Sequence, residues 1–473
     1  MRPPILELDD GFYDVVKPAT FPRHRLRFRN RVWDARIGLG QLGGGAWESH
    51  FARFVALPEN LPAPLALRYH GHQFRSYNPG LGDGRGFLFG QVRELEGDRR
   101  LLDLGTKGSG KTPWSRSGDG RLTLKGGVRE VLATEMLEAL GVDTSKSLSL
   151  FETGEPLIRG DEPSPTRSSV LTRLSHSHVR YGTFQRLAAE RDARRMNDLV
   201  DYCLRNLLPE VTPKIGLERV PAMLAAVAAR AARTCGQWMV AGFVHGVLNT
   251  DNMNVTGESF DYGPYRFLPA YDPDFTAAYF DGSGLYAYGR QPETVVWNLE
   301  RLAEALRLVS TKEALAGALD GYPAALEEST RAQVLFRLGL ESGGAAQDDA
   351  LTSALFGFLA EGDVPFDVPF FDLFGGRTPE PEHPRAALYV GPRFTELAQL
   401  LAQFRPRFEV FPTYFAGEAP CTLVYDEIER IWAAIADTDD WTPFCRKITD
   451  IRAMGAALRG ENRGAREAAL SSR

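Results

Sequence analysis

The stretch from Phe243 to Asp272 reads FVHGVLNTDNMNVTGESFDYGPYRFLPAYD. It contains an adjacent Asp251–Asn252 pair, and Asp261 follows Asn252 by nine residues, inside an Asp-Tyr-Gly sequence. An Asn and an Asp at the two ends of a short strand pair offer hard oxygen ligands, which Mg²⁺ uses beside substrate phosphates. The stretch therefore predicts a metal site held by Asn252 and Asp261.

The spacing within this stretch is that of a protein-kinase catalytic loop, which has the form H-x-D-x-x-x-x-N and is followed by D-F-G. His245 and Asn252 keep the kinase separation of seven residues, but Val247 stands where a kinase has its catalytic Asp. Asp251 is the only acid left between them. A turn-rich surface loop would explain the same residues, so the sequence upstream is needed to choose between a metal site and such a loop.

Two glycine-rich loops upstream have the composition of phosphate-binding turns. The first is LGDGRG at 81–86, and the second is GSGKTPWSRSGDGR at 108–121. A Gly-Asp-Gly turn lets backbone N–H groups approach a phosphate closely, and Arg85 beside it could add a charged fork. A hairpin turn with an exposed arginine is the competing interpretation.

A lysine, a glutamate and two arginines follow the first glycine-rich loop, and the lysine and glutamate come in the order found in protein kinases. A strand over 99–107 ends at Lys107, and a helix expected from Gly127 carries Glu130 in its first turn. Strand lysine followed by helix glutamate is the order of the kinase ion pair that holds lysine against nucleotide phosphates, although an acid also suits any helix N-terminus. Arg173 and Arg180 could share one helix face or flank a loop and converge on phosphates, or they could be two solvated surface arginines.

The sequence from Gly105 to Thr112, GTKGSGKT, also fits the P-loop pattern G-x-x-x-x-G-K-[ST] letter for letter. A P-loop needs a long helix directly after it. Pro113 and the glycines that follow it oppose such a helix, so a P-loop NTPase is a minor alternative.

Composition restricts the class of protein. The chain has 473 residues and a net charge of −6, which argues against a general nucleic-acid binder. It has no run of 18 apolar residues and no apolar signal core at the N-terminus, so we expect no membrane span and a cytoplasmic protein. The four cysteines are scattered without zinc spacing.

Together these motifs resemble the selenoprotein O family of kinase-fold protein adenylyltransferases, in a bacterial-type form. The resemblance covers residues 71–306 and is carried by GHQF (71–74), LGDGRG (81–86), KGSGKTPWSRSGDGR (107–121), REVLATEML (129–137), LTRLSHSHVRYGTF (171–184), GFVHGVLNTDNMNVTGESFDYGPYRFL (242–268) and YAYGRQPETVVWNLERLAEAL (286–306). It implies an α+β, bilobal, protein-kinase-like fold. We expect a β-rich nucleotide-binding lobe with one key helix at 1–185, a helical catalytic lobe with the metal loop at 186–310, and a divergent helical extension of that lobe at 311–473.

The resemblance also implies a reaction. ATP would bind inverted relative to kinases, and AMP would pass to Ser, Thr or Tyr hydroxyls of acceptor proteins as pyrophosphate leaves. Asp251 would accept the proton, Asn252 and Asp261 would hold Mg²⁺ or Mn²⁺, and Asp261 would also lie near the nucleotide. The remaining positions carried over for ATP binding are Gly82, Gly84, Arg85, Lys107, Asp119, Gly120, Arg173 and Arg180, with Glu130 paired to Lys107.

Some positions depart from the family pattern. Gly80 replaces a Gln before the first loop, and Lys111 replaces the Arg whose loss creates the P-loop match. Residues 278–281 read Ala-Tyr-Phe-Asp in place of Asn-His-Ser-Asp, and no terminal Cys or selenocysteine is present to support redox chemistry. The alternatives are an inactive ATP-binding module and an ordinary phosphotransferase. The protein targets and the oligomeric state stay open.

Overall fold

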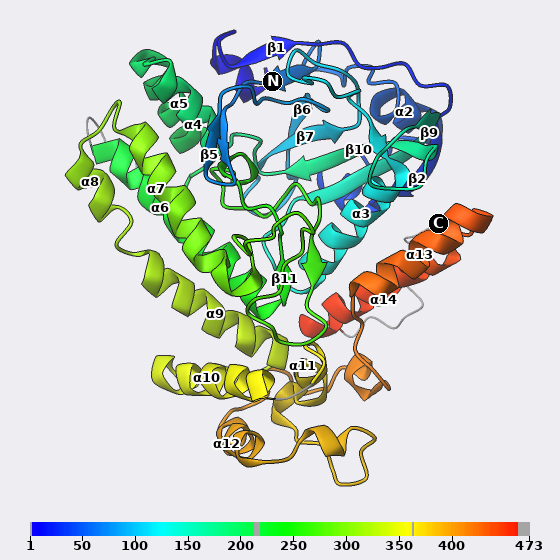
Figure 1. Cartoon of the computed structure of the whole chain (residues 1–473), viewed down its shortest axis with the longest axis vertical. Helices are drawn as coiled ribbons and strands as arrows, with labels where there is room; N and C mark the ends of the chain where they lie inside the picture. Colours follow the sequence, from blue (N-terminus) through cyan, green and yellow to red (C-terminus); the bar gives the residue numbers. More distant parts are fainter. Residues whose placement is uncertain (1, 212–217, 362–363, 462–473) are drawn as a thin grey trace.

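A computed structural model describes residues 2–211, 218–361 and 364–461 (Figure 1). One half of the molecule is built on an antiparallel sheet, and the other half is mainly helical, which confirms the α+β class. The sheet order is β1 (Tyr13–Val15), β3 (Leu65–Leu67), β6 (Leu88–Arg93), β7 (Leu101–Lys107), β10 (Thr166–Ser175), β9 (Lys146–Leu157) and β2 (Arg25–Arg29), with β8 (Leu122–Thr123) paired to β10.

The centre of the sheet is buried on both faces. Every residue of β7 is buried, and β10 is buried along almost its whole length, which suits their runs of Leu, Thr and Val. Lys107 ends β7 and pairs in register with Leu171 of β10, while Gly105 pairs with Arg173. The predicted strand at 99–107 is thus confirmed over Leu101–Lys107, and β7 and β10 bring Lys107 and Arg173 close together.

Helix α3 (Leu124–Ala139) packs across β9 and β10. It begins three residues before the predicted Gly127, because the Thr123 side chain accepts a hydrogen bond from the Gly126 N–H and caps the helix there. Gly127 faces the sheet, where an added Cβ would lie 2.5 Å from Leu150. The helix can therefore approach the sheet closely, and it presents Glu130 to Lys107.

The helical half is organised around α6 (Arg219–Val240), which packs against α7 (Gln291–Leu306) and α9 (Tyr322–Leu338). After α6 the chain forms β11 (Phe243–Val244), a 3-10 turn at Thr250–Asn252, and β12 (Arg266–Phe267), which pairs with β11. Helix α8 (Lys312–Gly317) packs beside α6 and α7, whereas α10 (Ala345–Glu361), α11 (Val368–Asp372) and α12 (Pro392–Leu401) extend this half away from the sheet (Figure 1).

Several smaller elements complete the fold. Helices α4 (Tyr181–Ala189) and α5 (Ala193–Asn206) connect the sheet to α6. The sheet half also carries α1 (Arg31–Arg36), α2 (Gly44–Phe51), and the separate hairpin of β4 (Gly71–Gln73) and β5 (Ser76–Asn78).

The last two described helices, α13 (Tyr425–Thr438) and α14 (Thr442–Leu458), return to the sheet half (Figure 1). Helix α14 packs along α3, where Arg452 Nε donates to Glu135 Oε2 at 2.7 Å. The division at residues 185 and 310 stays a prediction. The structure adds that the end of the third predicted segment lies against the helix of the first.

The described residues bear on the expected absence of a membrane span and on the state of the cysteines. Across the described ranges, no helix combines the length and hydrophobicity needed to cross a bilayer. All four cysteines are free thiols, and three of them are buried. The cytoplasmic location stays a prediction.

Candidate active site

A cavity of about 720 Å³ lies where the glycine-rich loops, β7, β10 and the stretch after β11 meet. It is lined by nearly all of the residues singled out in the sequence: Gly82, Gly84, Arg85, Lys107, Asp119, Gly120, Arg173, Arg180, Asp251, Asn252 and Asp261. Glu130 does not line the cavity, because it is fully buried behind Lys107. Residues up to 179 positions apart in the chain therefore converge, and their individual roles stay proposals.

The inner end of the cavity is a network of charged side chains. Lys107 Nζ lies 2.5 Å from Glu130 Oε2 and 2.9 Å from Asp261 Oδ1. Arg173 Nη1 lies 3.3 Å from Glu130 and 3.2 Å from Asp261. Burial alone would raise the pKa of Asp261, but the charges of Lys107, Arg173 and Arg180 hold that pKa well below its usual range. Asp261 is therefore a carboxylate throughout the physiological pH range.

The two arginines reach this network from either side of a loop. Arg173 lies within β10, and Arg180 is the N-cap residue of α4, so the alternative that both share one helix face is wrong. Arg180 Nη1 donates to the Asp251 carbonyl at 2.6 Å and lies 3.6 Å from Asp261 Oδ2. Its guanidinium stacks 4.8 Å from the centre of the Phe260 ring. Neither arginine is the solvated surface residue that the sequence also allowed.

Asp251 differs sharply from Asp261 in its surroundings. Its side chain is buried, and burial raises its pKa to about 6, although the charge of Arg180 opposes the shift. Oδ2 accepts a long hydrogen bond of 3.4 Å from Gln73 Nε2, and Oδ1 has no hydrogen-bond partner. A buried carboxylate oxygen without a partner costs folding free energy. At the wall of a cavity, it is suited to accept a proton.

Asn252 and Asp261 are the residues that would hold a divalent cation. Asn252 Nδ2 donates to the Val247 carbonyl at 2.8 Å, which fixes the amide and leaves Oδ1 as the free ligand atom. Across the described parts of the chain, no group of three or more His, Cys, Asp or Glu side chains could form a metal cage of protein ligands alone. An amide oxygen and a carboxylate fit Mg²⁺ or Mn²⁺, which take their remaining ligands from phosphates and water.

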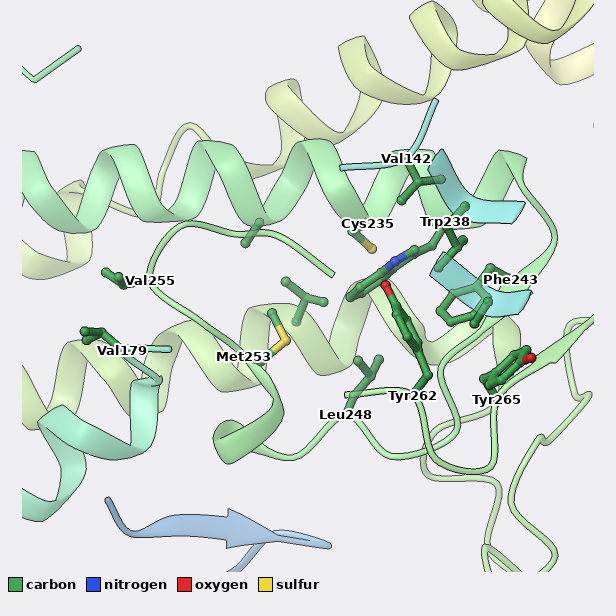
Figure 2. Packing of buried hydrophobic residues seen from close by; sticks show 14 of the residues in the cluster. Val142, Val179, Cys235, Trp238, Phe243, Leu248, Met253, Val255, Tyr262 and Tyr265 are labelled. Atoms are coloured by element: carbon green, nitrogen blue, oxygen red, sulfur yellow. The ribbon is translucent and has the colours of Figure 1, made fainter. Parts of the chain in front are cut away.

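The chain segment around these two residues packs against a cluster of buried aromatic side chains (Figure 2). Trp238 Nε1 on α6 donates to Ser259 Oγ at 2.9 Å, and Tyr262 OH donates to the same oxygen at 2.8 Å. His245 Nε2 lies 3.0 Å from the Phe260 carbonyl, and burial lowers the pKa of this histidine, so it is neutral. Figure 2 shows the surrounding rings: Trp238, Phe243, Tyr262 and Tyr265.

The two glycine-rich loops pack on each other. An added Cβ on Gly82 would lie 2.4 Å from Trp114, and one on Gly84 would lie 2.8 Å from the Trp114 carbonyl oxygen. Ser115 Oγ donates to the Gly84 carbonyl at 2.5 Å. These glycines are therefore needed for loop packing, and the first loop is more than an isolated hairpin turn with an exposed arginine.

Asp119 lies at the open end of the cavity. Its carboxylate is bound by both terminal nitrogens of Arg159, at 2.9 and 3.1 Å. Arg159 and Arg116 also line the cavity, as do Asp83 and Gln73, and none of these four was predicted. The repeated Gly-Asp-Gly-Arg pattern marked the loops, but nothing in the sequence marks an arginine that reaches in from the turn after β9.

The P-loop alternative does not fit the structure. Residues 108–121 form an irregular loop rather than the start of a helix, and β7 before the loop pairs antiparallel with both β6 and β10, unlike the parallel strands of a P-loop fold. Lys111 is exposed and is not among the residues that line the cavity.

A strand lysine paired with a helix glutamate, an Asn–Asp oxygen pair, and two glycine-rich loops over an antiparallel sheet define a phosphate-transferring enzyme. Residues 1–452 match the family described as "Protein adenylyltransferase SelO", and the chain belongs to that family. The predicted family is therefore confirmed, and the match extends well beyond residue 310.

Curated relatives agree over almost the whole chain. "Protein nucleotidyltransferase YdiU" from Synechocystis sp. is 44% identical over 469 residues, which cover 94% of this chain and 96% of the relative. The protein of the same name from Gloeobacter violaceus is 44% identical over 464 residues, covering 95% and 94%. A third, from Bradyrhizobium sp. strain BTAi1, is 37% identical over 456 residues, covering 92% and 90%.

Proposed function

We propose that the protein transfers AMP from ATP to Ser, Thr or Tyr hydroxyls of acceptor proteins and releases pyrophosphate. The names of the family and of its relatives support nucleotidyl transfer. The structural observation that carries the proposal is Asp251, a buried carboxylate with one unpartnered oxygen at the wall of a cavity lined by cations. Such a group is suited to deprotonate an acceptor hydroxyl.

The distribution of cations supports an inverted nucleotide. Lys107, Arg173 and Arg180 surround Asp261 at the inner end of the cavity. Arg85 and Arg116 are exposed on the glycine-rich loops and line the same cavity. A triphosphate that runs between these two groups meets positive charge along its whole length, with its α-phosphorus free to face Asp251.

In the proposed reaction, Asp251 takes the proton of the acceptor hydroxyl as that oxygen bonds to the α-phosphorus. The bond from this phosphorus to the bridging oxygen breaks, and pyrophosphate departs with the electron pair. Lys107 and Arg173 offset the negative charge that develops on the leaving group. A divalent cation on Asn252 and Asp261 would supply further charge neutralisation for the phosphates.

The unpartnered oxygen of Asp251 also argues against an inactive ATP-binding module. A module that only binds nucleotide gains nothing from an unsatisfied buried carboxylate, which destabilises the fold. A γ-phosphotransferase would use the same base, so the position of the transferred phosphorus has to be measured.

The test compares ATP labelled at the α-phosphate with ATP labelled at the γ-phosphate, in the presence of Mg²⁺ and a mixture of acceptor proteins. We expect protein-bound label from the α position only. The label should disappear in Asp261→Ala and fall at least about 100-fold in Asp251→Asn, the size expected for loss of a general base.

Asp320→Asn is the matched control, since Asp320 is exposed and lies outside the cavity. Label from the γ position would establish a kinase and overturn the inverted nucleotide. Bound ATP without transfer of either label would identify a binding module.

A further inference from the structure

Three consecutive residues of the β4–β5 hairpin, from His72 to Phe74, form hydrogen bonds to the loop that carries Asp251. The His72 N–H donates to Thr250 Oγ1 at 2.7 Å, and the Phe74 N–H donates to Asn249 Oδ1 at 3.1 Å. Between them, Gln73 Nε2 reaches Asp251. The hairpin tip and the proposed catalytic base therefore form one unit.

The tip of this hairpin has an unusual backbone. Phe74 and Arg75 both have positive φ values, 50° and 62°. Two-residue hairpin loops with this geometry normally use Asn-Gly or Asp-Gly, because a bulky side chain is strained there. Strain of this kind persists where the side chains themselves are needed.

The Phe74 side chain continues into an exposed aromatic surface. Its ring lies 5.0 Å from Tyr286 and 5.9 Å from Phe280, and the Phe280 ring lies 5.1 Å from Tyr279. Tyr279 is 86% exposed, Phe280 51% and Phe74 38%. We call these three residues the aromatic rim. Three large exposed rings in contact mark a binding surface rather than a solvated loop.

We propose that the aromatic rim docks the acceptor protein by taking an apolar or aromatic side chain that flanks the modified hydroxyl. This inference rests on the proposed function, because that reaction requires a protein segment to bring a hydroxyl to Asp251. The rim is continuous with the cavity at the position where that segment must enter: Gln73 lines the cavity, and Phe74 is the next residue. Tyr286 fixes the junction, since its hydroxyl donates to Asn249 Oδ1 at 2.7 Å.

The test uses two pools of synthetic peptides with Ser, Thr or Tyr at the centre. One pool has Phe and Leu at the flanking positions, and the other has Ala and Gln. We expect wild-type protein to transfer α-label to the apolar pool with about tenfold higher kcat/KM, the effect of one well-buried aromatic contact. Tyr279→Ser/Phe280→Ser should reduce that preference to about one.

Three controls accompany the peptides. The Kd for MgATP and the rate of ATP cleavage by water should be unchanged in the double variant, since neither residue lines the cavity. Val390→Ser/Val410→Ser removes two other exposed apolar side chains, 68% and 65% exposed, and should keep the wild-type preference. Sedimentation velocity reports whether the rim joins two copies of the chain.

The outcomes separate the two proposals. Label in both pools without preference, or a preference that persists in the rim variant, would overturn the docking surface and leave AMP transfer standing. A wild-type dimer that the rim variant dissolves would assign the rim to a second copy of the chain. No α-label in any acceptor would overturn AMP transfer itself and the docking surface with it.

Discussion

At the scale of single residues, two aspartates close together in the sequence have opposite electrostatic surroundings, which suit the different roles that we propose for them. Asp261 is held ionised by Lys107, Arg173 and Arg180, whereas Asp251 is buried with one oxygen unpartnered. A carboxylate kept ionised by cations suits the binding of a metal ion that also contacts phosphates. A carboxylate with a raised pKa is the better proton acceptor.

The raised pKa of Asp251 predicts a pH dependence. Because the base must be deprotonated, kcat/KM for α-label transfer should rise about tenfold per pH unit below about 6 and level off above it, since its pKa is raised to about 6. The measurement is a pH–rate profile from pH 4.5 to 8.5. A profile that is flat across pH 6 would exclude Asp251 as the base.

The same shift gives an independent check on stability. The pKa of Asp251 is higher in the folded protein than its ordinary value of 3.8, so its stabilising effect is complete below that value and is lost as the pH rises through about 6. At pH 8, the free energy of unfolding of Asp251→Asn should therefore exceed that of wild type by about 3 kcal/mol, and its melting temperature should be higher. The advantage should vanish near pH 4. An equal effect at both pH values would contradict the assigned pKa.

At the scale of elements, sequence order predicted Lys107 on a strand and Glu130 on the following helix, because hydrophobic periodicity and glycine positions mark both elements. It could not place Arg159 or Gln73, because each enters the cavity from an irregular turn or a hairpin that carries no phosphate-binding motif. Helix α3 begins at Leu124 rather than at the predicted Gly127, and the sequence did not indicate this because the capping residue, Thr123, also belongs to strand β8.

The strained hairpin tip predicts a variant in which stability is kept while transfer to the peptide falls. Phe74→Asn/Arg75→Gly supplies the residues that this turn prefers and keeps the backbone N–H bonded to Asn249. We expect a melting temperature at least equal to that of wild type, since relief of about 1–2 kcal/mol of strain offsets the lost ring contacts. Transfer to the apolar peptide pool should nevertheless fall about fivefold. Unimpaired transfer in this stable variant would show that the tip does not contact the acceptor.

At the scale of the whole molecule, the cavity is lined by both halves, so a bound nucleotide joins them. The resemblance to the selenoprotein O family predicted the two halves. It did not predict that α13 and α14 return to α3, because an amphipathic helix shows that it has a buried face but does not identify the partner.

Because a bound nucleotide contacts both halves, its binding should raise the free energy of unfolding of the protein. MgATP at about 100 times its Kd should stabilise the protein by about 2.7 kcal/mol. That corresponds to a melting temperature about 3 °C higher for a chain of this length. EDTA should reduce the shift, and Asp261→Ala should respond to ATP but not to added Mg²⁺. The measurement is differential scanning calorimetry with and without EDTA. A shift that EDTA leaves unchanged would mean that Asn252 and Asp261 hold no metal.

The contact of α14 with α3 has a consequence for the order in which the enzyme is completed. Glu130 lies on α3, and α13 and α14 pack against α3 on the side away from the sheet. A nascent chain whose sheet and cavity loops have already left the ribosome still lacks this cover until translation passes residue 458. The helix that carries Glu130 is therefore among the last parts of the protein to gain its full packing, and a partly synthesised chain lacks the support of the Lys107–Glu130 pair at the cavity.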